Sequence, residues 1–291
     1  MITREIINKV RKIEIKTRGL SNHIFAGEYH SAFKGRGMTF SDVREYMAGD
    51  DIRAIDWNVT ARFNHPYVKV FEEERELTVI LLVDLSASGN FGTTVQFKKD
   101  LITELCAVLS FSAIQNNDKI GVIFFTDIIE KFIPPKKGKT HILRIIRELI
   151  EFKPANKKTN ITEALRYVSN VIKKKSIVFV ISDFTDTQFE DALKYTNKKH
   201  DVVALQIYDP KEMELPDIGL LSLLDAETGE TIEIDSSNLE FRKAYKKGAL
   251  QKEKKLNEAF TKSGIDWIKL RTDQNYVQQL MILFKKRGRK A

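Results

Sequence analysis

Residues 77–88 read Leu77-Thr78-Val79-Ile80-Leu81-Leu82-Val83-Asp84-Leu85-Ser86-Ala87-Ser88, and this stretch decides the fold. Its first seven residues are mostly apolar and β-branched, which predicts a buried strand. Asp84, Ser86 and Ser88 follow at once, ahead of a helical pattern over 93–115. One carboxylate and two hydroxyls therefore leave the end of a buried strand together, at the edge where a parallel sheet binds ligands.

The rest of the chain alternates strand and helix patterns. Strands are predicted at 119–125, 176–182, 202–208 and 265–270, with an edge strand at 128–133 that Pro134-Pro135 ends; helices are predicted at 140–151, 161–173, 187–199, 238–262 and 273–287. This alternation predicts an α/β fold with a doubly wound, mostly parallel sheet and helices on both faces.

The domain organisation follows from the same patterns. Residues 1–75 are expected to hold an amphipathic helix over about 1–20, followed by glycine-rich loops, short strands and turns. The α/β domain is expected over 76–287, with a hairpin-like insertion at 217–235 and a basic tail at 285–291.

Composition limits the classes of protein that the chain can belong to. It has 291 residues, of which 42% are hydrophobic and 30% charged, as in globular proteins. Its longest apolar runs are strand-sized, shorter than the 18–20 residues or so that span a bilayer, and its N-terminus lacks the apolar core of a signal peptide. The single cysteine, Cys106, excludes an internal disulfide and is expected to be buried. These features predict a soluble cytoplasmic protein.

The formal net charge of +8 is concentrated in part at the two ends, including Lys285-Lys286-Arg287. Such ends favour binding to nucleic acid or an anionic membrane, and this is the main alternative function. Basic termini are also common as solubilising segments, so nucleic acid is not the favoured partner.

Two further segments resemble parts of a metal site. Strand 177–182 ends on Asp183, and Thr159 lies in a loop that opens a helix. Carboxylate and hydroxyl oxygens suit Mg²⁺ or Mn²⁺ rather than zinc. Together with the first stretch, these residues resemble the metal-ion-dependent adhesion site (MIDAS) of von Willebrand factor A domains. The resemblance implies that the metal keeps an open position for an acidic side chain of a protein partner, and that its ligands are Asp84, Ser86, Ser88, Thr159 and Asp183.

Each of these residues also has a local structural interpretation. Thr159 or Asn160 could cap the helix that follows, with Glu163 completing a capping box. Ser86 and Ser88 could satisfy turn backbone, and Asp183 could lie at a helix start where the dipole favours an acid.

Residues 33–62 contain a second recognisable pattern: Arg44-Glu45-Tyr46, then Gly49-Asp50-Asp51-Ile52-Arg53, then Ile55-Asp56-Trp57. Matching features follow at Asp209-Pro210 and at 225–229. From about residue 27 to about 235 the chain resembles the domain of unknown function 58 family. The resemblance implies a von Willebrand factor A-like domain and a MoxR-type AAA+ ATPase as partner. Many relatives carry transmembrane helices, whereas this sequence shows no apolar run of that length, so it resembles the soluble branch of the family.

Arginines and aspartates alternate in this second pattern. Paired in bidentate fashion, they could attach an irregular segment to the main domain. Tyr46 and Trp57 are expected to be buried anchors. The alternative is an exposed partner-binding patch formed by Arg44, Arg53, Asp56, Trp57 and Arg62.

Enzyme motifs receive little support. Gly138-Lys139-Thr140 lacks the first glycine of a phosphate-binding loop, because Ile133 stands there. No Gly-x-Ser-x-Gly elbow is present. A magnesium-dependent phosphatase using Asp84 is the least favoured alternative, because Ser86 stands where its second acid is expected. The sequence therefore predicts a non-enzymatic, metal-dependent protein-binding module that acts as an adaptor in the assembly or maturation of other bacterial proteins.

Overall fold

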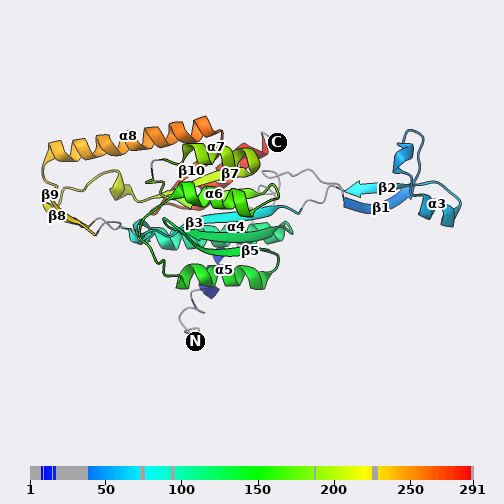
Figure 1. Cartoon of the computed structure of the whole chain (residues 1–291), viewed down its shortest axis with the longest axis horizontal. Coiled ribbons are helices and arrows are strands. Elements are labelled where there is room, and N and C mark those ends of the chain that lie inside the picture. Colours follow the sequence, from blue (N-terminus) through cyan, green and yellow to red (C-terminus); the bar gives the residue numbers. More distant parts are fainter. Residues whose placement is uncertain are drawn as a thin grey trace. The chain divides into compact units, whose positions relative to one another are not determined.

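The computed structural model describes residues 8, 10–14, 16–17, 39–72, 76–92, 96–186, 188–224 and 229–289. The chain forms two compact units, one comprising residues 34–76 and the other the remaining sequence on both sides of it. The larger unit contains the predicted α/β domain with a six-stranded and a two-stranded sheet, and the smaller unit has a two-stranded sheet (Figure 1).

The larger unit is built on a six-stranded sheet. In spatial order its strands are β10 (Asp266–Arg271), β7 (Asp201–Tyr208), β6 (Ile177–Ser182), β3 (Thr78–Asp84), β4 (Lys119–Phe125) and β5 (Ile129–Lys136). Neighbouring strands run parallel except at the β4–β5 edge, which is antiparallel. This confirms the predicted doubly wound, mostly parallel sheet.

Helices cover both faces of the sheet. One face carries α4 (Lys98–Gln115), α5 (Lys139–Glu151) and α9 (Tyr276–Gly288); the other carries α6 (Ile161–Val171), α7 (Glu190–Lys199) and α8 (Leu239–Ser263). Successive side chains of β3 alternate between the two cores, with Leu81 in the first and Leu82 in the second. Both faces of the central strand are therefore dry, which explains its continuous apolar run.

Several element boundaries differ from the sequence prediction, and two of the differences concern the start of α4 and the end of β5. A short 3-10 helix, η3 (Ala87–Asn90), follows the strand, and helix α4 begins at Lys98 rather than at residue 93, since Phe97 before it is extended. Strand β5 continues through Pro134-Pro135 instead of ending there. Proline is tolerated on an edge strand, and Gly121 on β4 leaves the space: a Cβ there would lie 2.9 Å from the Pro135 nitrogen.

The smaller unit pairs β1 (Thr39–Glu45) with β2 (Tyr67–Glu72) in an antiparallel ribbon. Between them lie a 3-10 helix, η2 (Ile52–Ala54), and a seven-residue helix, α3 (Trp57–Phe63), in a region predicted to be loops and short strands. Asp56 starts α3 by accepting hydrogen bonds from the Asn58 and Val59 amides. The helix ends at Asn64, which adopts the left-handed conformation.

The predicted insertion is a hairpin of β8 (Leu220–Leu224) and β9 (Thr231–Asp235), and its turn at 225–228 lies outside the described residues. It follows a 3-10 helix, η4 (Pro210–Glu212), at the end of β7. The N-terminal helix predicted over 1–20 and the basic tail lie partly outside the described residues; of the former, Val10 and Ile13 pack against the first core. Among the described residues, no helix is long and apolar enough to cross a membrane.

Candidate functional site

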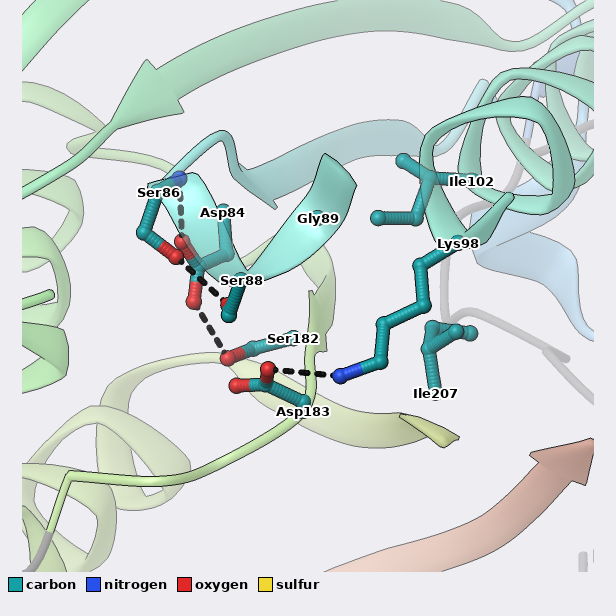
Figure 2. A pocket seen from close by; sticks show the side chains of 9 residues that line it. All are labelled: Asp84, Ser86, Ser88, Gly89, Lys98, Ile102, Ser182, Asp183 and Ile207. Carbon is teal, nitrogen blue, oxygen red and sulfur yellow. Dashed lines mark hydrogen bonds and ion pairs between the residues drawn. The ribbon is translucent and has the colours of Figure 1, made fainter. Parts of the chain in front are cut away.

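The candidate site lies where the strand order of the sheet reverses. After β3 the chain builds β4 on one side of it and then returns to build β6 on the other side. The carboxyl ends of β3 and β6 therefore lie side by side at a topological switch point, the place where open α/β sheets bind ligands. A pocket opens there, as Figure 2 shows, and its polar lining consists of Asp84, Ser86, Ser88, Lys98, Ser182 and Asp183.

Asp84 is the last residue of β3 and is 4% exposed. Its Oδ1 accepts a hydrogen bond from the Ser86 amide at 2.9 Å, and its Oδ2 accepts one from Ser182 Oγ at 2.6 Å. Burial, with the nearby charge of Asp183, raises the pKa of Asp84 to about 7. A positive charge placed beside such a buried carboxyl group strongly favours its ionised form.

The two serines present their hydroxyls to the same point. The η3 turn holds Ser86 Oγ 3.0 Å from Ser88 Oγ. Adjacent ligands of an octahedral Mg²⁺, each about 2.1 Å from the metal, lie about 3.0 Å from each other. The spacing of the two hydroxyls and the all-oxygen donor set therefore fit a hard divalent cation.

Asp183 follows β6 and is paired with a lysine. Its Oδ2 accepts a hydrogen bond from Lys98 Nζ at 3.0 Å, and its Oδ1 accepts one from Thr185 Oγ1 at 3.2 Å. Helix α7 begins seven residues later, at Glu190, so Asp183 does not lie at a helix start, as one local interpretation suggested. Among the described residues, its charged partner is the ammonium of Lys98.

Lys98 is 1% exposed and also forms an ion pair with Glu212. Burial acts to lower the pKa of Lys98, but the charges of Asp183 and Glu212 outweigh it, and the pKa is raised. The ammonium is therefore a permanent positive charge in the wall of the pocket. It is the main feature of this site that sequence reasoning missed.

The turn after Asp183 is strained. Phe184 has a φ of 55°, in the left-handed region that glycine adopts most easily. Its amide donates to Ser182 Oγ at 3.0 Å, and its ring packs edge-on against Phe260 at a centroid distance of 5.0 Å. Aromatic packing thus holds a conformation that the backbone alone disfavours.

Thr159, the fifth predicted ligand, is not among the described residues that line the pocket. Its loop is attached to the site, because the Ala87 amide donates to the Lys157 carbonyl at 3.0 Å. The neighbouring Asn160 caps α6 by accepting from the Glu163 amide at 3.0 Å, which confirms the predicted capping role for that residue. Four of the five predicted ligands therefore share one pocket, and the fifth lies on a loop that contacts it.

Sequence reasoning missed Lys98, Ser182 and Glu212. One local signal did exist for Lys98, since a lysine in the first turn of a helix opposes the helix dipole and needs a compensating acid. Lys99 also lies in the first turn of α4, yet it is half-buried and its described side-chain hydrogen bond goes to the Phe152 carbonyl. The sequence therefore does not distinguish the two lysines.

The predicted partner-binding residues lie in the smaller unit. Arg44 forms a bidentate pair with Asp50 at 2.6 and 2.7 Å, within the segment itself rather than with the main domain. Asp56 caps α3, and its Oδ2 lies 3.7 Å from Lys69 Nζ. Arg53 and Arg62 are exposed.

The prediction that Trp57 is a buried anchor is wrong. Its side chain is 67% exposed, while Tyr46 is half-buried. Trp57 is the first residue of α3, a helix with no buried residue, and a two-stranded ribbon with one short helix offers no second layer to cover an indole.

Known proteins resemble this chain in sequence or in structure. An uncharacterized protein of Mycobacterium tuberculosis (strain ATCC 25618 / H37Rv) is 27% identical over 285 residues, which is 97% of this chain and 90% of the relative. The crystal structure of an aerotolerance-related membrane protein from Bacteroides fragilis matches 74% of this chain and 100% of that chain, with 15% identity and a TM-score of 0.51. The SpRpn10 VWA domain matches 74% of this chain and 95% of its own, with 10% identity and a TM-score of 0.37.

The family model described as "Protein of unknown function DUF58" matches residues 42–255. Its range includes the smaller unit from Asp42, within β1, onward, the candidate site and most of α8. The family expected from the sequence is therefore confirmed, and the chain belongs to the family of unknown function DUF58.

Proposed function

We propose that this protein is a metal-dependent protein-binding module. Mg²⁺ or Mn²⁺ binds at the switch point through Asp84, Ser86, Ser88, Thr159 and Asp183, directly or through water. The observation that carries this proposal is the 3.0 Å spacing of the two serine hydroxyls beside a buried carboxylate. Hard oxygen donors at octahedral spacing are the ligands that these cations prefer.

The proposed metal links recognition to charge. The nearby charge of Asp183 disfavours ionisation of the buried Asp84, and a divalent cation relieves this repulsion. An open coordination position then accepts a carboxylate from a partner, as in the adhesion sites that these residues resemble. The chain's own groups thus hold the metal, and an acidic residue of the partner completes its coordination.

The family resemblance extends the proposal to a partner. A MoxR-type AAA+ ATPase is the proposed partner, and the module acts in the cytoplasm as a non-enzymatic adaptor in the assembly or maturation of other proteins. The exposed residues Arg44, Arg53, Trp57 and Arg62, together with Asp56, are the proposed second contact surface. Their exposure on a small separate unit supports that assignment.

The alternative of a basic nucleic-acid or membrane surface has less support. Arg287, in the last turn of α9, forms ion pairs with Asp201 and Asp266 of neighbouring strands. This arginine is therefore engaged in holding α9 to the sheet. Phosphate binding would have to rely on the other basic residues of the termini.

Calorimetric titration of Mn²⁺ and Mg²⁺ into the wild type and Asp84→Ala tests the metal site. We expect one site in the wild type and none in the variant. A pull-down of the MoxR-type ATPase with and without EDTA then tests the function, and capture should be lost both in EDTA and in Asp84→Ala. Capture that is insensitive to both would refute metal-dependent binding, and a steep loss of binding with salt would favour the basic surface.

A further inference from the structure

We propose that Lys98 is an internal competitor for the metal, whose ammonium occupies Asp183 in the metal-free state and moves away when the cation binds. This inference rests on the metal site of the proposed function and adds a residue that regulates it. It assigns to α4 a role in setting metal affinity, and therefore in deciding when the adhesion site is able to accept a partner.

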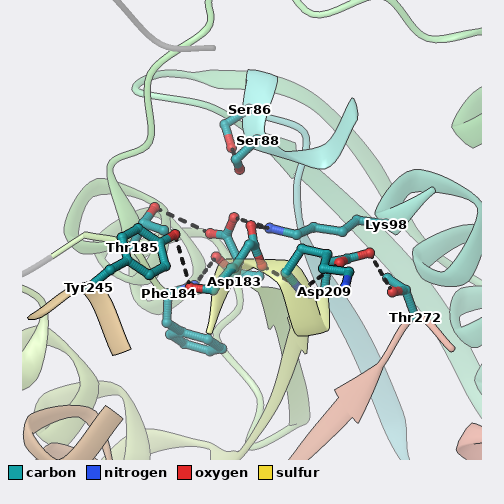
Figure 3. Close-up of polar contacts among 12 residues, drawn as sticks. Ser86, Ser88, Lys98, Asp183, Phe184, Thr185, Asp209, Tyr245 and Thr272 are labelled. Atoms are coloured by element: carbon teal, nitrogen blue, oxygen red, sulfur yellow. Dashed lines mark hydrogen bonds and ion pairs between the residues drawn. The ribbon is translucent and has the colours of Figure 1, made fainter. Parts of the chain in front are cut away.

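The geometry places Lys98 at the ligand itself. Nζ lies 3.0 Å from Asp183 Oδ2, the side chain is 1% exposed, and the residue lines the same pocket as Asp84 and the two serines. Figure 3 shows the ammonium approaching Asp183 from the α4 side, below Ser86 and Ser88. A divalent cation bound near Asp183 would face this positive charge at close range, so both cannot pair fully with the same carboxylate.

Glu212 gives the lysine a second position. Lys98 pairs with Glu212 as well as with Asp183, and Glu212 is firmly held. Its Oε2 accepts from the Asp209 amide at 2.9 Å in a capping box that starts η4, and its backbone carbonyl accepts from Tyr245 Oη at 3.2 Å. When a metal takes Asp183, the ammonium can remain paired with Glu212 without leaving the protein interior.

The support for Glu212 extends further into the domain. Asp209, which is fully buried, accepts from the Lys211 amide and from Thr272 Oγ1, each at 2.9 Å. Figure 3 shows Asp209 beside Thr272, the residue after β10. The position of Glu212 is thus defined by β7, η4 and the end of β10, so it does not depend on whether a metal is bound.

Lys98 could lower metal affinity through the net charge of the site or by occupying Asp183, and a pair of variants separates these two effects. Lys98→Met removes the competitor and one positive charge. The double variant Lys98→Met/Glu212→Gln removes the competitor together with one negative charge, so its net charge equals that of the wild type. The double variant also avoids leaving the partly buried carboxylate of Glu212 without its lysine partner, which favours its folding.

The test is the Mn²⁺ affinity of each protein, measured by calorimetry and by loss of the free Mn²⁺ signal in electron paramagnetic resonance. We expect the double variant to bind Mn²⁺ about tenfold more tightly than the wild type, or more, a change that corresponds to about 1.4 kcal/mol. Adding Asp84→Ala to the double variant should abolish that binding. If the double variant binds no more tightly than the wild type, the proposal is wrong, because net charge alone would then account for the effect of Lys98.

Glu212→Gln alone provides a measurement that does not depend on removing the lysine. With its second carboxylate neutralised, Lys98 pairs more strongly with Asp183, so Mn²⁺ affinity should fall below that of the wild type. An unchanged or increased affinity would contradict the competition. Absence of Mn²⁺ binding in all of these proteins would also overturn it.

The competition and the proposed function fail in distinguishable ways. None of these titrations contains a partner, so they report on Lys98 and the metal alone. Tight Mn²⁺ binding by the double variant without EDTA-sensitive capture of the ATPase would support the role of Lys98 and refute the binding function. Equal Mn²⁺ affinity of the double variant and the wild type, together with EDTA-sensitive capture of the ATPase, would refute the role of Lys98 and support the binding function.

Discussion

Two regions of this protein use the same residue types for different ends. At the switch-point pocket, Asp183 is paired with a buried lysine; in the smaller unit, Asp50 is paired with an exposed arginine. Burial raises the pKa of Asp84 to about 7, whereas the hydrogen bond from Arg44 lowers that of Asp50 to about 2. Desolvation, not composition, therefore separates the region suited to binding a cation from the region that merely pairs its charges.

Removing the basic side chain from the ion pair of each region should give the largest contrast in stability. Lys98→Met leaves Asp183 and Glu212 without their buried partner, and breaking a buried ion pair costs about 3–5 kcal/mol of unfolding free energy. Arg44→Met removes an exposed partner of Asp50 and should leave the stability close to that of the wild type. Urea denaturation followed by circular dichroism measures both. Equal losses would mean that Lys98 is better solvated than its burial indicates.

Matched aromatic substitutions test the same contrast through packing. Phe184→Ala removes a ring that is 5% exposed and packs against Phe260 and Phe189, and such truncations cost about 3–5 kcal/mol. The substitution does not relieve the backbone strain at residue 184, because alanine also disfavours the left-handed conformation. Trp57→Ala, at an exposed site, should change the stability by about 0.5 kcal/mol or less. A large loss for Trp57→Ala in thermal unfolding would show that its indole packs against something in solution.

Neutralising Asp84 should separate metal binding from folding. Asp84→Asn keeps the size of the side chain and removes the buried charge, so Mn²⁺ binding is expected to be lost while the folded state persists at neutral pH. Asp50→Asn in the smaller unit serves as the matched control and should bind Mn²⁺ as the wild type does. Calorimetry measures both, and retained binding in Asp84→Asn would remove Asp84 from the ligand set.

The smallest expected effect is the acid response of the smaller unit. Asp50 has a native pKa below its ordinary value of 3.8, so its pairing stabilises the unit fully above that value and is lost as the pH falls from about 4 to about 2. Fluorescence of Trp57 in a Trp267→Phe background should report this loss. Asp50→Asn should be insensitive over the same range; an identical acid transition in both proteins would assign it to other groups.

Local patterns predicted most of the larger unit. The apolar runs at 77–83 and 177–182 became β3 and β6, because a strand buried on both faces needs a continuous apolar sequence. The same patterns placed Asp84 and Asp183 at one sheet edge. They misplaced the end of β5, since whether proline breaks a strand depends on the neighbour it meets, here Gly121. They also misjudged Trp57, because burial requires a second layer that the small unit lacks.

The sequence by itself determined three local features: which segments are buried strands, which oxygen donors follow them, and that a helix begins shortly after Thr159. These features depend on residues a few positions apart, and period and turn chemistry express them directly. Only the tertiary structure decided that Lys98 meets Asp183 and Glu212, which lie 85 and 114 residues away along the chain. A pairing over such separations is set by how α4, β6 and η4 converge on one sheet edge, and no local pattern contains that information.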